Sequence, residues 1–148
     1  MPPRKERIAV VLDTNVFVGY YLSRAPQSAN ARVVRLWRDQ RKLQLIVSDA
    51  IVTEYLEILL RLQVEEQRIN RLAEHLQRRD TVTHVRLGPR LAASRDPDDN
   101  IVLATAVVGK AKFLVTNDRD LLDISTAQRR KLKFEIVRPQ EFLARLAE

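Results

Sequence analysis

The amino-acid sequence predicts an α/β domain built on a central, mainly parallel sheet of four to five strands. Short and nearly continuous apolar runs, typical of strands buried on both faces, occur at 7–13, 43–47, 112–118 and 133–137. Segments with helical apolar spacing separate most of these runs, which is the order expected of βαβ units. The chain has 148 residues, of which 45% are hydrophobic, and we therefore expect a single domain over residues 1–148.

The first half of the chain supplies two strands and three helices in this interpretation. Residues 7–13, "RIAVVLD", form a central strand, and residues 29–40 place their apolar side chains on one side, as in a helix. The second strand, 43–47, is followed by Ser48 and Asp49, both good N-cap residues for a helix whose apolar spacing continues to Leu62. A further helix is expected over 64–79.

The second half contains the remaining strands. Residues 81–85 alternate weakly and predict an edge strand, and the Gly-, Pro- and Asp-containing stretch 86–97 predicts a surface loop. Residues 100–109 are apolar nearly all round, which predicts a buried helix that stops at Gly109. Strands at 112–118 and 133–137 follow, and Pro139 begins a closing helix. The order of the strands in the sheet is not predicted.

The composition restricts the possible chemistry. Subtracting 19 acidic from 26 basic residues gives a net charge of +7, which favours a polyanionic partner or serves only to keep the protein soluble. The absence of cysteine excludes disulfides and thiolate metal sites, and two histidines make a histidine-rich metal site unexpected. The N-terminal apolar run is too short for a signal peptide or a membrane span, so we expect a soluble, intracellular protein.

Carboxylates are expected to gather at one edge of the sheet. Asp13 and Asp118 each follow a strand, and the carboxyl ends of parallel strands share one edge, where ligands bind in open α/β sheets. Glu54 lies early in the helix that follows the second strand and is expected near the same edge. Asp98 and Asp99 open a later helix, whose start the strand order alone does not place.

Each carboxylate also has a structural explanation. Asp96 and Asp98 fit the start of a helix, where acidic side chains complement the helix dipole. That explanation is not expected to apply to Asp13 at a strand end, although Asp13 could form an Asx-turn. Carboxylates that converge without a basic partner require a cation, and oxygen ligands alone select Mg²⁺ or Mn²⁺. Together with a basic surface, this indicates phosphodiester chemistry.

Four motifs in the same order resemble those of the PIN-domain ribonucleases, in particular VapC-like toxins of toxin–antitoxin systems. They are "VVLDTNVFVG", "VSDAIVTEYLEIL", "DPDDNIVLATAVVGKAKFLVTNDRDLL" and "IVRPQEFL", and they span almost the whole chain. The resemblance implies a three-layer α/β/α fold and metal-assisted hydrolysis of RNA. It assigns an acidic quartet that would hold Mg²⁺ or Mn²⁺ and carry catalysis: Asp13, Glu54, Asp99 and Asp118.

The resemblance also implies supporting residues and partners. Polar support for the carboxylates is assigned to Thr14, Asn15 and Thr116, and Asp96 and Asp120 are further candidates for the same role or for metal contact. Substrate phosphates would be held by basic residues near the site, each of which could equally form a surface ion pair: Arg86, Arg90, Arg95 and Arg119. A cytoplasmic homodimer with an RNA substrate and a small antitoxin, and no membrane, is expected.

Two other functions compete with this interpretation. The first is a nucleic-acid-binding protein of the same fold whose acidic cluster is inactive or structural. The second, an aspartate phosphatase of the haloacid dehalogenase kind, needs an Asp two positions after the first, where this sequence has Asn15. Three aromatic residues, Tyr20, Tyr21 and Trp37, could stack on bases, but their helical spacing favours a place in the core.

Overall fold

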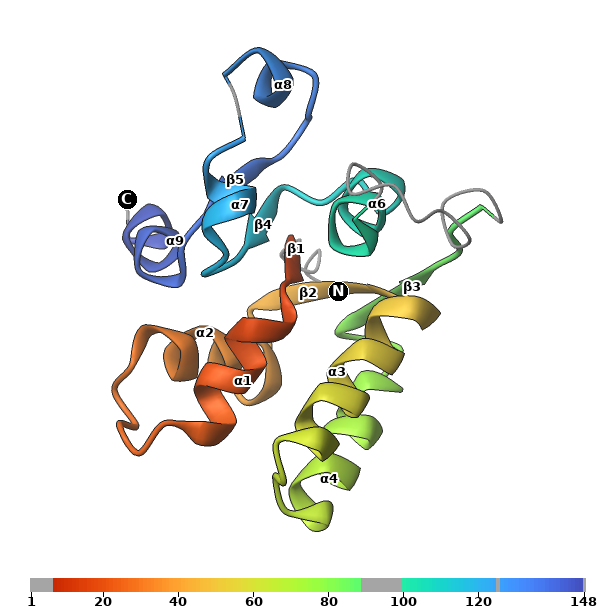
Figure 1. The fold of residues 1–148 in the computed structure, drawn as a ribbon, viewed down its shortest axis with the longest axis vertical. Helices are drawn as coiled ribbons and strands as arrows, with labels where there is room; N and C mark the ends of the chain where they lie inside the picture. The colour runs from red at the N-terminus through yellow and green to blue at the C-terminus, as the bar shows by residue number, and fades with distance from the viewer. Residues whose placement is uncertain (1–6, 89–99, 125, 148) are drawn as a thin grey trace, which may run out of the picture.

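A computed structural model describes residues 7–88, 100–124 and 126–147. Its centre is a sheet of five strands, all parallel, in the order β3-β2-β1-β4-β5 (Figure 1). The strands are β1 (Ile8–Leu12), β2 (Leu43–Ser48), β3 (Val82–Val85), β4 (Phe113–Val115) and β5 (Glu135–Val137). The predicted fold class is confirmed, and the expected edge strand at 81–85 does lie at one edge of the sheet.

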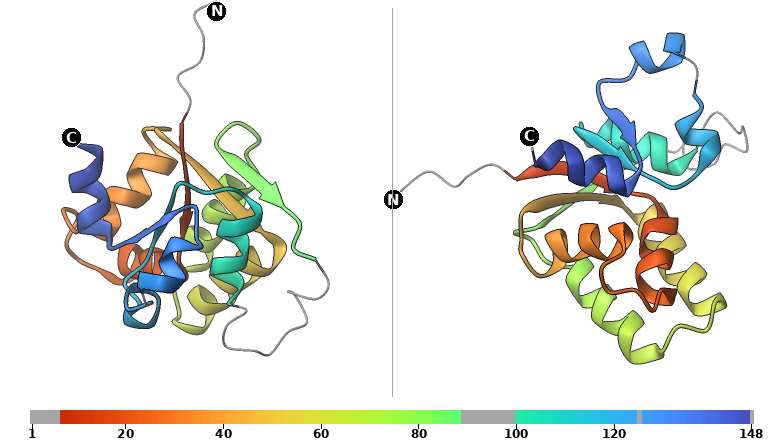
Figure 2. Two further views of the ribbon diagram at one scale, coloured as in Figure 1. Left: turned by 90° about the horizontal axis from the view of Figure 1, so that it is seen from above. Right: turned by 90° about the vertical axis from the view of Figure 1, so that its left-hand side faces the viewer.

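Helices cover both faces of this sheet. They are α1 (Thr14–Leu22), α2 (Ala29–Arg38), α3 (Asp49–Arg61), α4 (Glu66–Leu76), α6 (Ile101–Val108), α7 (Arg119–Leu122), α8 (Thr126–Arg130) and α9 (Pro139–Leu146). Figures 1 and 2 show α1 to α4 on one side of the sheet and α6 and α7 on the other. Right-handed crossovers account for this division, because the chain moves outward from β1 to β3 and then reverses direction to reach β4 and β5.

The core follows the apolar runs of the sequence. The last three residues of β1, Val10 to Leu12, are fully buried, as expected for a central strand with helices on both faces. Trp37 is also fully buried and Tyr21 is 7% exposed, so the core interpretation of these two aromatic residues is correct. None of the helices in the described part of the chain is long and apolar enough to cross a bilayer.

Helix α1 was not anticipated from the sequence. Its residues, "TNVFVGYYL", are rich in β-branched and aromatic types that have low helix propensity. Packing decides the conformation instead, because Val16 and Phe17 are fully buried and the Phe17 ring lies 4.7 Å from the Tyr55 ring, centroid to centroid. The short helices α7 and α8 were also missed, and α4 is shorter than the predicted range 64–79.

The predicted helix boundaries at Ser48 and Gly109 are confirmed. The Ser48 hydroxyl accepts a hydrogen bond from the Ile51 amide at 3.3 Å and caps α3. Gly109 is the C-cap of α6, and a Cβ atom at this position would lie 2.2 Å from Cγ2 of Ile46 in β2. The missing side chain therefore allows the end of α6 to approach the sheet closely.

Candidate active site at the carboxyl edge of the sheet

The polar residues that directly follow β1 and β4 lie side by side, because the two strands are paired. Leu12 pairs with Val115 in the parallel ladder, and the Asp13 amide then donates to the Val115 carbonyl at 2.9 Å. The Thr116 amide continues toward β5 and donates to the Val137 carbonyl at 2.9 Å. The prediction that the residues after these two strands share an edge is therefore confirmed.

The Asp13 carboxylate is nearly enclosed at this edge, with 8% of the residue exposed. Its Oδ1 accepts from the Thr14 amide at 2.8 Å, and its Oδ2 accepts from the Thr116 hydroxyl at 2.6 Å and from the Asn15 side-chain amide at 3.1 Å. Burial raises the pKa of Asp13, the hydrogen bonds from Thr116 and Thr14 lower it, and the charges of Glu54 and Asp118 raise it further. The net effect is a raised pKa, so the site disfavours the ionised form in the absence of a cation.

The expectation that a helix-capping role would not apply to Asp13 is wrong. Asp13 is the N-cap of α1, with extended backbone angles and a side chain that accepts from the Thr14 amide. The expectation failed because a helix start was considered only at Asn15, two residues after the position where α1 is capped. The Asn15 side chain is not the cap of α1, and instead donates to the carboxylate of Asp13.

Thr116 connects the two carboxylates that follow β1 and β4. Its hydroxyl donates to Asp13 and accepts from the Asp118 amide at 2.9 Å, and the residue is fully buried. Asp118 in turn caps α7, with its Oδ1 accepting from the Asp120 amide at 2.9 Å. The hydroxyl of Thr116 thereby fixes the position of Asp118 relative to Asp13.

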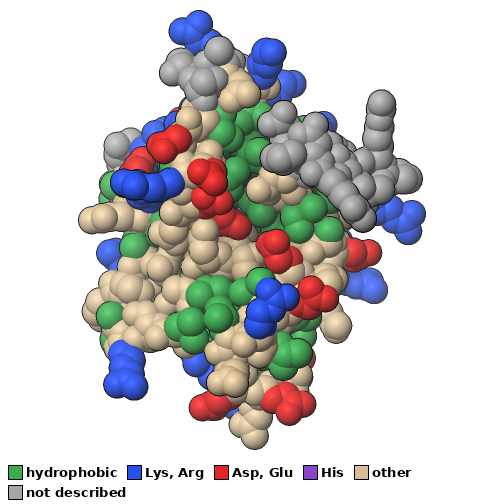
Figure 3. Space-filling model, in the orientation of Figure 1, with side chains coloured by type: hydrophobic (Ala, Val, Ile, Leu, Met, Phe, Trp, Pro, Cys, Tyr) green, Lys and Arg blue, Asp and Glu red, His purple; other side chains and the backbone are tan. Residues whose placement is uncertain are grey.

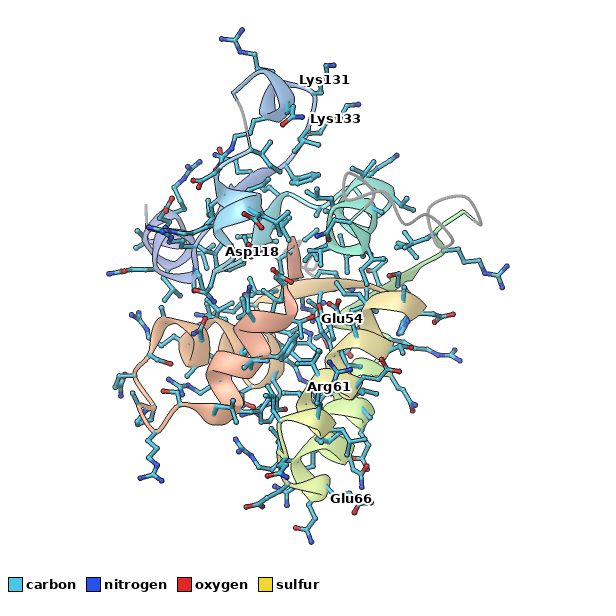
Figure 4. The ribbon with its side chains drawn as sticks, in the orientation of Figure 1. Glu54, Arg61, Glu66, Asp118, Lys131 and Lys133 are labelled. Atoms are coloured by element: carbon cyan, nitrogen blue, oxygen red, sulfur yellow. The ribbon has the colours of Figure 1, made fainter. Side chains whose placement is uncertain are left out.

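Glu54 reaches the same edge from the second turn of α3. The Thr14 hydroxyl donates to its Oε2, and its charge acts on Asp13. Figure 4 shows Glu54 and Asp118 on either side of the junction between β1 and α1, where Asp13 lies. No Lys or Arg in the described part of the chain forms an ion pair with any of these three carboxylates.

Two further residues, to which the sequence assigned no role in holding the carboxylates, support this edge. The Tyr55 hydroxyl, fully buried, donates to the Leu12 carbonyl directly before Asp13. Burial, together with the charges of Asp13 and Glu54, raises the pKa of this phenol well above its ordinary value, which keeps its proton in place. Tyr55 lies in the helix that apolar spacing predicts as far as Leu62, but nothing in the sequence indicates its hydroxyl contact.

Asn117 is the second such residue. Its backbone amide donates to Oδ1 of Asn15 at 3.1 Å, and its side-chain amide donates to Oδ1 of Asn30 at 3.0 Å. These contacts connect the end of β4 to α1 and to the first turn of α2. Asn117 therefore holds the orientation of Asn15, which itself donates to Asp13.

The structure describes two of the four arginines predicted to hold substrate phosphates. Arg86 and Arg119 are exposed, and Arg119 is the first residue of α7, next to Asp118. The other two basic candidates, Arg90 and Arg95, lie outside the described residues. The acidic candidates Asp96, Asp98 and Asp99 lie outside them as well. Figure 3 shows the face of the molecule that is turned to the viewer in Figure 1. Acidic side chains lie across the middle of that face, and most Lys and Arg side chains lie toward its periphery.

A groove of about 920 Å³ leads away from Asp118. Acidic residues of α7 and its C-cap line one part, and Leu103, Leu121 and Ile124 form apolar walls. Lys131 lines the groove as well. The groove therefore shares Asp118 with the acidic edge.

The described residues do not by themselves form a complete metal site. Over residues 7–88, 100–124 and 126–147, no group of three or more His, Cys, Asp or Glu side chains is placed to hold a metal ion. Asp13, Glu54 and Asp118 are nevertheless brought to one edge without a basic partner. Their donor set is carboxylate oxygen only, which is the kind that Mg²⁺ and Mn²⁺ prefer.

An all-parallel α/β/α domain with clustered carboxylates at the carboxyl edge belongs to the class in which ligands bind beyond the strand ends. The family model described as "PIN domain" matches residues 9–120. The chain is therefore a member of the PIN-domain family, whose members are generally nucleases that use divalent metals. Asp13, Glu54 and Asp118 all lie within the matched range.

A solved structure shares this fold at low sequence identity. A chain of the crystal structure of VapBC2 from Rickettsia felis, bound to a DNA fragment from the promoter of its genes, matches with a TM-score of 0.55 and 13% identity. The match covers 88% of this chain and 98% of the other. Among curated proteins, no sequence matches.

Proposed function

We propose that this protein is a divalent-metal-dependent endoribonuclease, the toxin of a toxin–antitoxin pair. The observation that carries the proposal is the convergence of Asp13, Glu54 and Asp118, with Asp13 buried although burial and both neighbouring charges oppose its ionisation. Membership of the PIN-domain family supports nuclease chemistry, and the fold shared with a VapBC complex supports the toxin assignment.

The residues present fit Mg²⁺ or Mn²⁺. Mg²⁺ usually keeps several waters and is bound through one or two carboxylates, so it does not require three close protein ligands. In the proposal, Asp13, Glu54 and Asp118 hold the cation together with Asp99, which lies outside the described residues. When bound, the cation lowers the pKa of water and stabilises charge that develops on phosphate oxygens.

The remaining residues orient the carboxylates. Thr116 and Thr14 fix both oxygens of Asp13, and the Thr14 hydroxyl also restrains Glu54, so these carboxylates are held before substrate arrives. Asn15 performs the same task from α1, and Asp96 and Asp120 are proposed to assist at the rim. The basic residues Arg86, Arg90, Arg95 and Arg119 are proposed to hold the phosphates of the RNA.

The proposal also assigns partners and location. A small antitoxin would bind this protein and keep it inactive, and two copies would form a homodimer in the cytoplasm. A single-copy mass in light scattering at micromolar concentration would contradict the homodimer.

The test compares cleavage of a labelled, structured RNA by wild type, Asp13→Asn, Glu54→Gln and Glu66→Gln, each in Mg²⁺, Mn²⁺ and EDTA. Glu66 is exposed in the first turn of α4, at the lower end of the molecule in Figure 4 and well separated from Glu54, and is the matched control. Wild type and Glu66→Gln should cut only with metal. The two site variants should lose at least about 100-fold in rate.

Three results would count against the proposal. Equal cleavage by Asp13→Asn and wild type would indicate a contaminating nuclease. Binding of RNA with no cleavage by wild type across a panel of RNAs, together with no Mn²⁺ binding in calorimetry, would favour the inactive nucleic-acid-binding alternative. Faster cleavage of single-stranded DNA of the same sequence would overturn the assignment of RNA as the substrate.

A further inference from the structure

A basic site lies away from the acidic edge, where the ends of α1 and α2 meet α4. Figure 2 shows α4 beneath α1 and α2 in its right-hand view. A pocket of about 260 Å³ is formed there by side chains that we call the arginine–tyrosine pocket: Tyr20, Tyr21, Arg38, Arg68, Arg71 and His75. Asp39 also lines it.

The two tyrosine rings organise the guanidinium groups. Cζ of Arg38 lies 4.9 Å from the Tyr20 ring centroid, and Cζ of Arg68 lies 4.7 Å from the Tyr21 centroid and 6.0 Å from that of Tyr20. Nη1 of Arg68 also donates to the Tyr21 carbonyl at 3.1 Å. Cation–π attraction and the bond to the Tyr21 carbonyl orient the Arg68 guanidinium before a ligand binds, whereas Arg38 directs its Nε and Nη2 donors to Asp39.

The charges of the pocket do not balance. Asp39 forms an ion pair with Arg38, with Oδ1 accepting from Nε at 2.9 Å. Among the described residues, Arg68 and Arg71 form no ion pair with a carboxylate. Burial of His75 and the nearby charges of Arg78 and Arg38 lower its pKa, whereas Asp39 and Glu74 act in the opposite direction. With three arginines against one acid, Asp39, the lining of the pocket remains positive.

We propose that the arginine–tyrosine pocket binds a phosphate group, with Arg68 and Arg71 as its main contacts. Arginine presents paired donors that match phosphate oxygens. The volume is below the about 300–1,000 Å³ typical of sites for drug-sized ligands, which suits a phosphate better than a whole nucleotide. The phosphate belongs either to an RNA backbone or to a small phosphorylated molecule.

Helix α1 places this pocket within reach of an RNA strand at the acidic edge. Asp13 caps the first turn of α1 and Tyr20 lies seven residues later, a rise of about 10 Å along the helix axis. The pocket is therefore expected to act as a secondary anchor for the strand. The anchoring role rests on the proposed function, whereas phosphate binding by the pocket does not, because it is measured without RNA and without cleavage.

The experiment measures binding in EDTA by wild type, Arg71→Gln and the control Arg61→Gln. Arg71 and Arg61 are both exposed, and Arg61 lies on α3 outside the pocket (Figure 4). The probes are inorganic phosphate by calorimetry and a fluorescent single-stranded oligoribonucleotide by anisotropy over a range of salt. Arg71→Gln should weaken both by about tenfold and should reduce the salt slope for RNA by about 0.7, as for one lost phosphate contact, while Arg61→Gln retains wild-type phosphate binding.

The outcomes separate the sources of the phosphate. Loss of phosphate binding with unchanged RNA affinity would support a site for a small phosphorylated molecule. Loss of both would support the RNA backbone. Equal binding of both probes by Arg71→Gln and Arg61→Gln would overturn the proposal. Arg71-dependent binding of a glutamate-rich peptide, with none of phosphate or RNA, would overturn it in favour of a carboxylate-binding protein surface.

Discussion

At Asp13, the folded structure disfavours the ionised form that the proposed activity requires. Its raised pKa means that the folded chain binds its proton at a pH where the unfolded chain has already lost it. The contribution of Asp13 to the free energy of unfolding therefore decreases as pH rises from its unfolded value, about 3.9, to its folded value, and stays constant above that. Asn is also a good N-cap residue and has no ionised form.

Asp13→Asn should consequently be more stable than wild type at neutral pH when metal is absent. A gain on the order of 1 kcal/mol would raise the melting temperature by about 2–4 °C. The gain should shrink toward pH 4 and when Mg²⁺ is added, because Mg²⁺ stabilises only a protein that binds it. Thermal denaturation in EDTA between pH 4 and 8 measures this difference, and a variant that is less stable than wild type by the same margin at every pH would contradict it.

Tyr55 offers a second test at the same scale. Tyr55→Phe retains the ring that packs against Phe17 but removes the hydroxyl that donates to the Leu12 carbonyl. Loss of a partner for a buried carbonyl should lower the free energy of unfolding by about 1–3 kcal/mol. Urea denaturation checks this value, and unchanged stability would mean that the hydroxyl contact contributes nothing to the end of β1.

At the scale of elements, the close approach of α6 to β2 depends on Gly109. In Gly109→Ala, the new Cβ would lie 2.2 Å from Cγ2 of Ile46, a buried β-branched side chain that is 1% exposed, so part of the contact must shift. We expect a loss of about 1–3 kcal/mol in the free energy of unfolding. Gly88→Ala is the matched control, since no described atom lies within 4 Å of a Cβ at that position. Equal stability of the two variants in urea would show that the α6–β2 contact adapts.

The elements also show what the sequence can and cannot predict. Continuous apolar runs identified β1, β2, β4 and β5 because buried parallel strands need such runs, and capping residues located α3 and α6. Helix α1 was missed because packing on α2 and α3 outweighs the low helix propensity of its residues. The clustering of Asp13 with Asp118 was predictable from parallel pairing, but the contact between Asn117 and Asn30 depends on where α2 lies, which local sequence does not encode.

At the scale of the whole molecule, a net charge of +7 coexists with an acidic edge. Under the proposed function, the net charge would attract RNA from a distance, within the range that salt screening allows, whereas the carboxylates of the edge would repel phosphate at short range. A cation at the edge removes this repulsion. Without the cation, the three carboxylates should therefore weaken RNA binding at the place where catalysis is proposed.

Removing one of these charges should strengthen RNA binding in EDTA. Two unit charges about 4 Å apart in water interact by about 1 kcal/mol, so Glu54→Gln should bind a single-stranded RNA about fivefold more tightly than wild type. Glu66→Gln changes the net charge equally but lies far from the edge, so it should bind as wild type does. Anisotropy titrations at one ionic strength measure both affinities. If the two variants gained equally, net charge alone would govern RNA binding and the acidic edge would not face the RNA.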